Sequence, residues 1–276
     1  MSATPVADTK AAKAAPEEKM SFADRSRPFR WLLERELLRI FKLWTQTIIA
    51  PVVSSFLFIL VFGLSLGDRI SPIDGITYDQ FIVPGLIAMA MVQSAFSNSS
   101  TSVFQARFDR YIHDILAAPM RPWEINLGMS LGGVLRALTI GILLFAASAL
   151  VVDISIAKPL YLILATAILL VMFSSFGVVV GLYADSFDHH QFVNNIILLP
   201  LTFLGGVFYS VATLPPFWEG VSHVNPIFYL VQSIRYGFLG TSDVSPWLAL
   251  GITTAMAAIA VAWSTHLFTT GKRLKA

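Results

Sequence analysis

The feature that most constrains the fold is an apolar stretch between Gly205 and Gly240 that is interrupted by Pro215, Pro216 and Pro226. It is too apolar for an ordinary loop, and its prolines exclude one continuous spanning helix. It also lies between two stretches that could each cross a bilayer. Incomplete helix is tolerated at membrane depth only where protein or a water-filled cavity covers it. The stretch therefore predicts a re-entrant or interfacial element beside a pathway, and with it a transport function.

Composition places the chain among multi-pass membrane proteins. Of its 276 residues 55% are hydrophobic and 13% are charged, whereas soluble domains carry about 25% charged residues. The chain has no cysteine, which excludes disulfides and thiolate chemistry. Its net charge of +2 is too small to indicate nucleic acid binding. Residues 1–24 are rich in Ala, Lys and Pro and lack an apolar core, so we expect a disordered cytoplasmic tail.

Six segments are long and apolar enough to span a bilayer, which requires about 20 residues each. They cover roughly residues 44–66, 81–102, 125–152, 159–183, 192–211 and 247–268. Six crossings predict an all-α membrane protein with both termini on one side. GxxxG spacings at Gly63/Gly67, Gly128/Gly132 and Gly177/Gly181 predict close helix packing within the chain.

The distribution of lysine and arginine predicts which side this is. Nine lie up to Lys42, three lie between the second and third segments, and three lie in the C-terminal tail. The opposite side has three, Arg69, Lys158 and Arg235. Positive residues accumulate on the cytoplasmic side. We therefore expect cytoplasmic termini and an extracytoplasmic position for the stretch between Gly205 and Gly240.

A basic amphipathic helix over residues 28–43 precedes the first segment. On a helical wheel Phe29, Leu32, Leu33, Leu37, Ile40 and Trp44 share a face, and the basic residues of the helix are Arg30, Arg35, Arg39 and Lys42. Glu36 falls inside the apolar arc and interrupts it. Such a helix suits the headgroup layer. It either docks a cytoplasmic partner or only anchors the chain to the membrane surface.

The connection after the second segment has helical potential from Phe104 to Ala118 and ends at Pro119 and Pro122. A short helix of mixed aromatic and charged residues suits insertion into a groove of a soluble protein, although a solvated loop helix on the membrane has the same pattern. The candidate docking residues are Phe104, Arg107, Phe108, Arg110, Tyr111, His113 and Asp114.

Arg136 lies near the middle of the third segment. An arginine at that depth costs about 2.5–3.5 kcal/mol on insertion scales and indicates a function. It either makes structural hydrogen bonds, with the polar run from Gln93 to Ser100 or with carbonyl groups, or it faces a translocation cavity and meets an anionic headgroup.

The remaining polar groups do not form a catalytic or metal site. The loop from Tyr183 to His190 is predicted to cap the fifth segment, metal binding there being the minor alternative because no further ligand is close in sequence. In the proline-interrupted stretch, Asn225 and Pro226 predict a turn between two short helices. No hydrolase arrangement surrounds its polar and aromatic residues, and the residues of interest there are Pro215, Pro216, Trp218, Glu219, His223, Asn225, Pro226 and Arg235. We expect no catalytic, cofactor-binding or metal-binding residue on this chain. No GxxxxGK[ST] phosphate loop occurs either, so ATP would have to bind to a separate subunit.

Several motifs together resemble the permease subunit of ABC-2 type exporters. They are FRWLLERELLRIFKLWTQTIIAPVV, YDQFIVPGLIAM, FQARFDRYIHDILAAPMRPWEI and, most specifically, LGGVFYSVATLPPFWEGVSHVNPIFYLVQSIRYGFLG. The resemblance covers residues 25–276 and is strongest to small bacterial inner-membrane permeases. Permeases for nodulation factors, drugs and cell-surface polysaccharides are wider relatives.

This resemblance implies a non-catalytic membrane subunit that works as a pair of permeases with two copies of a separate ATPase, which would hold the ATP and Mg²⁺. It also implies an interface helix at residues 28–43, a coupling helix within residues 104–118, and short extracytoplasmic helices between the fifth and sixth spans. The substrate class would be a lipid, a glycolipid or polysaccharide, or a drug-like amphiphile. The other partners would be membrane lipids, with no nucleic acid.

Two alternatives belong to other classes. An ATP-independent channel or secondary carrier should show half-to-half symmetry and titratable groups in its spans, yet Arg136 is nearly alone there. A membrane enzyme would need a cluster of acid, base or metal ligands that the sequence does not contain.

Overall fold

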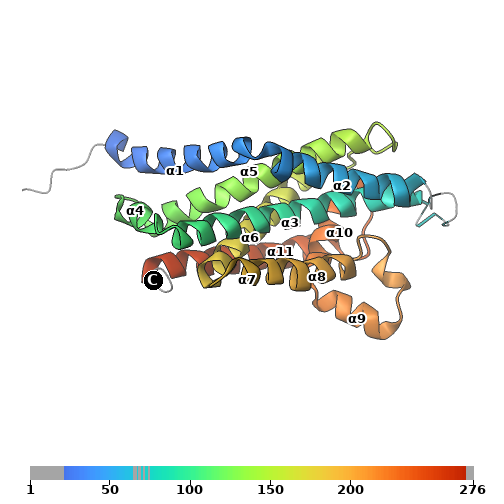
Figure 1. The fold of residues 1–276 in the computed structure, drawn as a ribbon. Helices are drawn as coiled ribbons and strands as arrows, with labels where there is room; N and C mark the ends of the chain where they lie inside the picture. The colour runs from blue at the N-terminus through green and yellow to red at the C-terminus, as the bar shows by residue number, and fades with distance from the viewer. Residues whose placement is uncertain (1–21, 65–66, 68–69, 71, 74, 272–276) are drawn as a thin grey trace, which may run out of the picture.

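The computed structural model describes residues 22–64, 67, 70, 72–73 and 75–271. These residues form a bundle of long helices, and their one β-feature is an isolated bridge between Ile73 and Ile76. Figure 1 shows the helices running roughly side by side along one axis. Most of the expected N-terminal tail, residues 1–21, lies outside the described residues.

The first helical run is almost continuous over residues 22–64. It consists of α1 (Phe22–Lys42), the π-helical turn η1 (Thr45–Ile49), α2 (Ala50–Phe58) and a second π-helical turn, η2 (Ile59–Leu64). The run therefore begins within the segment expected to be a disordered tail, and before the expected start at residue 28. In Figure 1, α1 lies along the bundle nearly in line with α2, rather than across its end.

In the part of the chain that the structure describes, five helices are long and apolar enough to cross a membrane. They are Thr45–Gly63 of the first run, α3 (Tyr78–Phe108), α5 (Pro122–Ser148), α6 (Pro159–Tyr183) and α11 (Pro246–Thr270). All five coincide with predicted spans, and α3 is the most buried of them.

The close packing of α6 on α3 depends on the predicted glycines. A Cβ at Gly177 would lie 2.5 Å from the Phe96 carbonyl oxygen, and one at Gly181 would lie 2.5 Å from the Ser100 carbonyl oxygen. Any larger residue would push the two helices apart. The packing role is thus confirmed for this pair, whereas a Cβ at Gly67 would meet nothing within 4 Å.

The predicted fifth span differs from the other five. It was predicted at residues 192–211, but the helical residues run from 187 to 204, as α7 (Phe187–Phe192), the π-helical turn η4 (Val193–Leu198) and α8 (Leu199–Leu204), and residues 205–210 are not helical. This segment is not among the five candidate spans. The polar residues at its start distinguish it from a regular apolar helix. The 18 residues would rise about 27 Å at 1.5 Å each, which is close to the thickness of a bilayer core.

The proline-interrupted stretch contains three short helices, η5 (Val211–Thr213), α9 (Pro216–Val224) and α10 (Pro226–Leu239). Asn225 separates α9 from α10, as the Asn-Pro pair predicted. Its Oδ1 accepts from the Ile227 N–H at 3.0 Å and its Nδ2 donates to the Leu201 carbonyl at 2.6 Å. Gly240 ends α10 with φ of 75°, a conformation that favours glycine.

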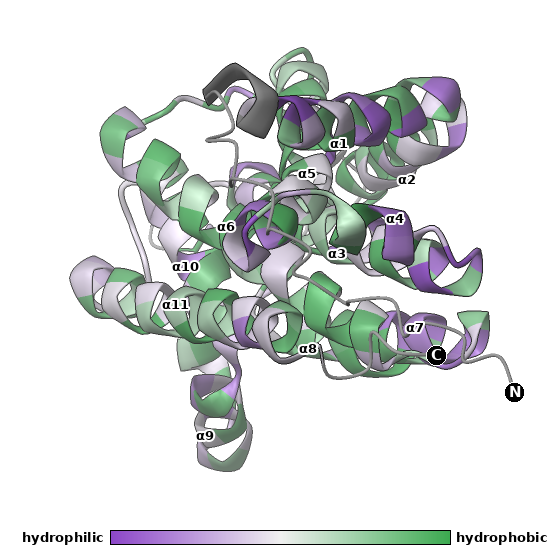
Figure 2. Cartoon of the chain, turned by 90° about the vertical axis from the view of Figure 1, so that its left-hand side faces the viewer, coloured by the Kyte–Doolittle hydropathy of each residue, from purple (hydrophilic) through white to green (hydrophobic). Residues whose placement is uncertain are grey.

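The two ends of the bundle differ in chemistry. One end, called the α4 end, carries α4 (Ile112–Ala117), the start of α1 and the end of α11, and the other, the α9 end, carries α9. Figure 2 looks onto the α4 end and shows hydrophilic residues on α1, α4 and α7 there.

Candidate functional site

A buried carboxylate holds α1 against the bundle. Leu32, Glu36 and Ile40 form the buried face of α1, and Glu36 has no exposed surface. This face lies on two glycines of α5, because a Cβ at Gly128 would lie 2.5 Å from Leu32 Cδ2 and one at Gly132 would lie 2.8 Å from Glu36 Oε2. The second GxxxG pair is therefore the surface on which α1 packs.

Three groups surround the Glu36 carboxylate. Ser102 of α3 donates its hydroxyl to Oε1 at 2.6 Å, and Arg39 Nη2 lies 2.9 Å from Oε2. Arg35 Nη1 lies 3.5 Å from Oε1. Burying a carboxylate is costly unless it is paired and hydrogen-bonded, and these partners meet that requirement.

On one side, the contacts continue to the turn that begins α4. Arg35 donates to the Tyr111 hydroxyl, and its guanidinium carbon lies 4.3 Å from the centre of the Tyr111 ring. Burial raises the pKa of the Tyr111 phenol above its usual value, so this group stays protonated at neutral pH. The start of α4 is thus tied to α1.

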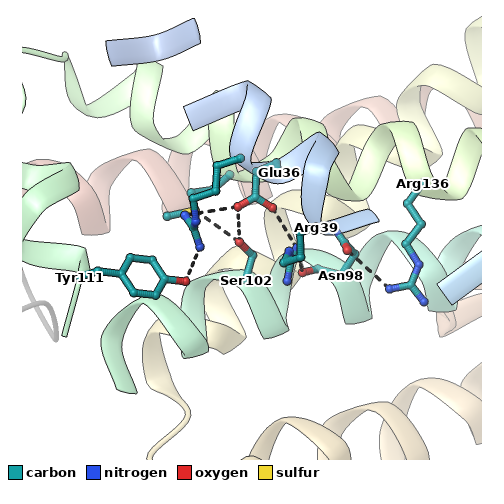
Figure 3. A network of polar contacts seen from close by, with 8 residues as sticks. Glu36, Arg39, Asn98, Ser102, Tyr111 and Arg136 are labelled. Carbon is teal, nitrogen blue, oxygen red and sulfur yellow. Dashed lines mark hydrogen bonds and ion pairs between the residues drawn. The ribbon is translucent and has the colours of Figure 1, made fainter. Parts of the chain in front are cut away.

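On the other side, the contacts continue toward the middle of the bundle. Arg39 donates to the Asn98 carbonyl at 3.1 Å, and the Asn98 side-chain oxygen accepts from Arg136 at 3.5 Å. Arg136 Nε donates to the Thr47 carbonyl at 2.8 Å, within the π-helical turn η1. Figure 3 shows the labelled members of this series from Tyr111 through Glu36, Ser102, Arg39 and Asn98 to Arg136. We call the whole series the polar chain: Tyr111, Arg35, Glu36, Ser102, Arg39, Asn98, Arg136 and Thr47.

The polar chain corrects part of the amphipathic analysis. Glu36 is the centre of the buried face rather than an interruption, and Arg35 and Arg39 fold toward it instead of forming a solvent face. Leu37 and Trp44 were expected on the buried face but are exposed. Helical periodicity misses this because it scores Glu36 as polar without knowing that cationic partners lie beside it. Arg30 and Lys42 are exposed.

The predicted helix from Phe104 to Ala118 is two helices instead of one. It breaks after α3 at residues 109–111, where Arg110 has φ of 65°. Phe104 is buried against Phe108 and Phe187, and Arg107 donates to the Gly181 and Ala184 carbonyls at 3.3 and 2.9 Å. Arg107 therefore holds α3 to the end of α6, and Phe104 packs α3 against α7. The candidates exposed at the α4 end are Phe108, Arg110, His113 and Asp114, with Tyr111 partly buried.

Arg136 also lines a cavity of about 510 Å³. The cavity lies between the first helical run, α3 and the η4–α8 segment, and Arg136 enters it from α5. Arg136 therefore makes structural hydrogen bonds and also borders a cavity, and its contact with an anionic headgroup stays a prediction. All three π-helical turns in the described residues belong to the first run and the η4–α8 segment. Such turns are frequent at functional sites.

Two charged side chains stabilise the proline-interrupted stretch by hydrogen bonds: Arg235 within it and Asp243 just after it. The Arg235 side chain is buried, donates to the Gly206 carbonyl at 2.7 Å, and lies 3.8 Å from the centre of the Phe81 ring. Asp243, which the sequence analysis missed, accepts from the Val211 N–H and from Gln232. Glu219 and His223 lie 3.9 Å apart on α9, both well exposed. Also on α9 are Pro216, within its first turn after Pro215, and the half-exposed Trp218.

The loop before α7 is a helix cap. The Ser186 hydroxyl accepts from the His189 N–H at 3.3 Å, and His190 is buried beside the Phe104 ring. Among the described residues no group of three potential metal ligands comes together.

Comparison with known proteins identifies the family of the chain. The family model described as ABC-2 type transporter matches residues 27–239. The chain is 40% identical over 232 residues to the inner membrane transport permease YadH of Escherichia coli K12, covering 83% of this chain and 91% of that protein. It is 25% identical over 219 residues to nodulation protein J of Sinorhizobium fredii, covering 77% and 82% respectively. The chain therefore belongs to the ABC-2 type transporter family.

Proposed function

We propose that the chain is the permease subunit of an ATP-driven exporter in a bacterial inner membrane. Two copies would form the translocation path, and two copies of a separate ATPase would bind at the α4 end, which would then face the cytoplasm. In this arrangement the residues from 187 to 204 form a sixth crossing despite their polar start, and α9 lies on the extracytoplasmic side. The exported substrate would be a lipid, a glycolipid or polysaccharide, or a drug-like amphiphile.

The observation that carries this proposal is the polar chain. It connects the turn before α4, where a cytoplasmic partner would bind, to Arg136 at the edge of the cavity. To couple ATP hydrolysis to transport, the permease needs a packed element with two alternative arrangements, and binding of the partner must favour one of them. Movement of α4 would be transmitted through Tyr111 and Arg35 to α1, and through Asn98 and Arg136 to the turn η1. The π-helical turns would let the first run and the η4–α8 segment change shape.

A proton-coupled carrier is the second class to consider, and the cavity does not favour it. The described residues that line the cavity include neither Asp, Glu nor His. Arg136, whose guanidinium stays charged at any physiological pH, is the titratable side chain among them. Coupling to a proton gradient usually uses a group that changes charge within the membrane.

The test is stimulation of ATP hydrolysis in a reconstituted complex of this chain with the ATPase that co-purifies with it. Phe108→Ala and Arg110→Glu change exposed residues, so we expect each to lower the stimulation at least fivefold. Because the Phe108 ring also contacts Phe187 of α7, the amount of folded permease is measured for each variant. Arg107 is unsuitable because it holds the end of α6.

Phe217→Ala is the matched control, since Phe217 is as exposed as Phe108 but lies on α9 at the opposite end. It should leave ATP hydrolysis unchanged. Equal stimulation by all three variants and the unmodified chain would remove α4 from the proposed coupling route.

A further inference from the structure

The cavity beside Arg136 changes from polar to apolar along the bundle. On α3 and on the η4–α8 segment its polar lining residues lie nearer the α4 end and its apolar ones nearer the α9 end. On the first run, which is antiparallel to α3, Gln46 lies nearest the α4 end and Phe58 nearest the α9 end, and the polar Ser54 and Ser55 lie between them. The polar residues nearer the α4 end are Gln46, Gln93, Ser94, Ser97, Arg136 and Asn194, and the apolar lining residues include Phe58, Leu86, Met89, Leu199 and Phe203.

The polar half presents hydrogen-bonding groups without partners. Ser94 and Gln93 line the cavity, and the Ser94 hydroxyl and the Gln93 amide nitrogen are buried and have no hydrogen-bond partner in the described residues. Ser94 is only 4% exposed. Buried polar groups are normally hydrogen-bonded, and each exception needs an explanation. A ligand headgroup in this half of the cavity would supply the missing acceptor.

The polar half is also positively charged. The hydrogen bonds described for Arg136 use Nε and Nη1, and none in the described residues uses Nη2. The nearest carboxylate of the polar chain, Glu36, is already occupied by Arg39, Arg35 and Ser102. No ion pair joins Arg136 to a carboxylate among the residues that the structure describes. This half of the cavity therefore offers a positive charge that an anionic group of a ligand would pair with.

We propose that the cavity binds an amphiphile with an acidic, phosphate-bearing headgroup. The phosphate would accept from Arg136 Nη2, Gln93 and Ser94, and the hydrocarbon would lie along Phe58, Leu86 and Phe203. This inference rests on the proposed function and names its substrate class. A lipid of the leaflet nearest the α4 end has its headgroup toward that end and its chains toward the middle of the bilayer, which matches the order of the lining.

The size of the cavity agrees with this ligand. At about 510 Å³ it lies within the usual range for small-molecule sites, about 300–1,000 Å³, and it would hold a headgroup with the first part of its chains. The remainder of the chains would extend beyond the cavity. Guanidinium is also the side chain best matched to phosphate oxygens.

The test measures lipid binding to the purified, delipidated chain alone, by native mass spectrometry with dioleoylphosphatidic acid as the probe. Dioleoylglycerol lacks the phosphate and inorganic phosphate lacks the chains, so both should bind at least tenfold more weakly. Because no ATPase is present, failure here would leave the coupling experiment unaffected, and failure of coupling would leave this binding unaffected.

Four variants locate the site. Arg136→Gln should weaken phosphatidic acid binding at least tenfold. Gln93→Leu and Ser94→Ala remove no internal hydrogen bond of the described structure, so they should fold normally and weaken binding severalfold each. Lys158→Gln removes one exposed positive charge outside the cavity and should bind as the unmodified chain does.

Unchanged binding in Gln93→Leu and Ser94→Ala would overturn the proposal, even if Arg136→Gln failed to fold. Equal binding of dioleoylglycerol would show an apolar site instead, and equal binding of inorganic phosphate would show a free-anion site. Both of those results would also overturn it.

Discussion

The Glu36 carboxylate offers the sharpest test of how α1 is held. Glu36→Gln keeps the shape of the side chain and can still hydrogen-bond to Ser102, but it removes the negative charge that Arg35 and Arg39 share. The side chain of Glu36 is fully buried, whereas those of Arg35 and Arg39 are 33% and 19% exposed. The substitution would therefore leave two partly buried cations without their counter-ion.

Removing one partner of a buried ion pair costs about 3–5 kcal/mol. Because the two arginines are partly exposed, water can solvate them in part, and the lower limit of that range applies. We therefore expect the free energy of unfolding to fall by about 3 kcal/mol. That corresponds to about a hundredfold in the ratio of folded to unfolded protein. The loss should appear as earlier unfolding of the purified chain in mixed micelles as the fraction of dodecyl sulfate rises.

Glu34→Gln is the matched control, because it makes the same chemical change on the same helix at an exposed position. Exposed substitutions of this kind usually change stability by less than about 0.5 kcal/mol. If Glu36→Gln and Glu34→Gln unfolded at the same dodecyl sulfate fraction, the polar chain would not stabilise α1 as argued here.

Two further predictions concern packing and capping. Gly177→Ala should lower thermal stability by several degrees because its Cβ would meet the Phe96 carbonyl, whereas Gly251→Ala, which meets nothing within 4 Å, should leave it equal or higher; equal melting of the two would contradict the packing argument. Asn225→Ala removes the cap of α10 and the hydrogen bond to α8, so it should lower the free energy of unfolding by about 1–2 kcal/mol in the dodecyl sulfate assay. A loss below about 0.3 kcal/mol would contradict a stabilising role for this side chain.

Much of the fold follows from hydropathy and helix-breaking residues. Five predicted spans coincide with the long apolar helices, because a bilayer imposes one length and one composition on every crossing. Asn225 and Pro226 correctly predicted the boundary between α9 and α10, since proline is favoured in the first turn of a helix and asparagine at the position that caps it.

The candidate site was less accessible to sequence analysis because its contacts join residues far apart in the chain. Glu36 could be recognised as unusual within an apolar arc, but Ser102 and Asn98 carry no local signal that they meet α1 and α5. The break at Arg110 was also missed, since an arginine gives no indication of a positive φ. Periodicity describes one helix at a time, and the polar chain is a property of four elements packed together.

The measurement that most directly tests the central claim is site-specific crosslinking of the assembled transporter in its native membrane. A photoreactive residue would replace Asp114, exposed on α4, and separately Gly220, at a position of α9 where an added Cβ meets nothing within 4 Å. Our account predicts a crosslink to an ATP-binding subunit from position 114 and none from position 220. A crosslink to that subunit from position 220, or from neither position, would contradict the proposal that the α4 end couples this permease to an ATPase.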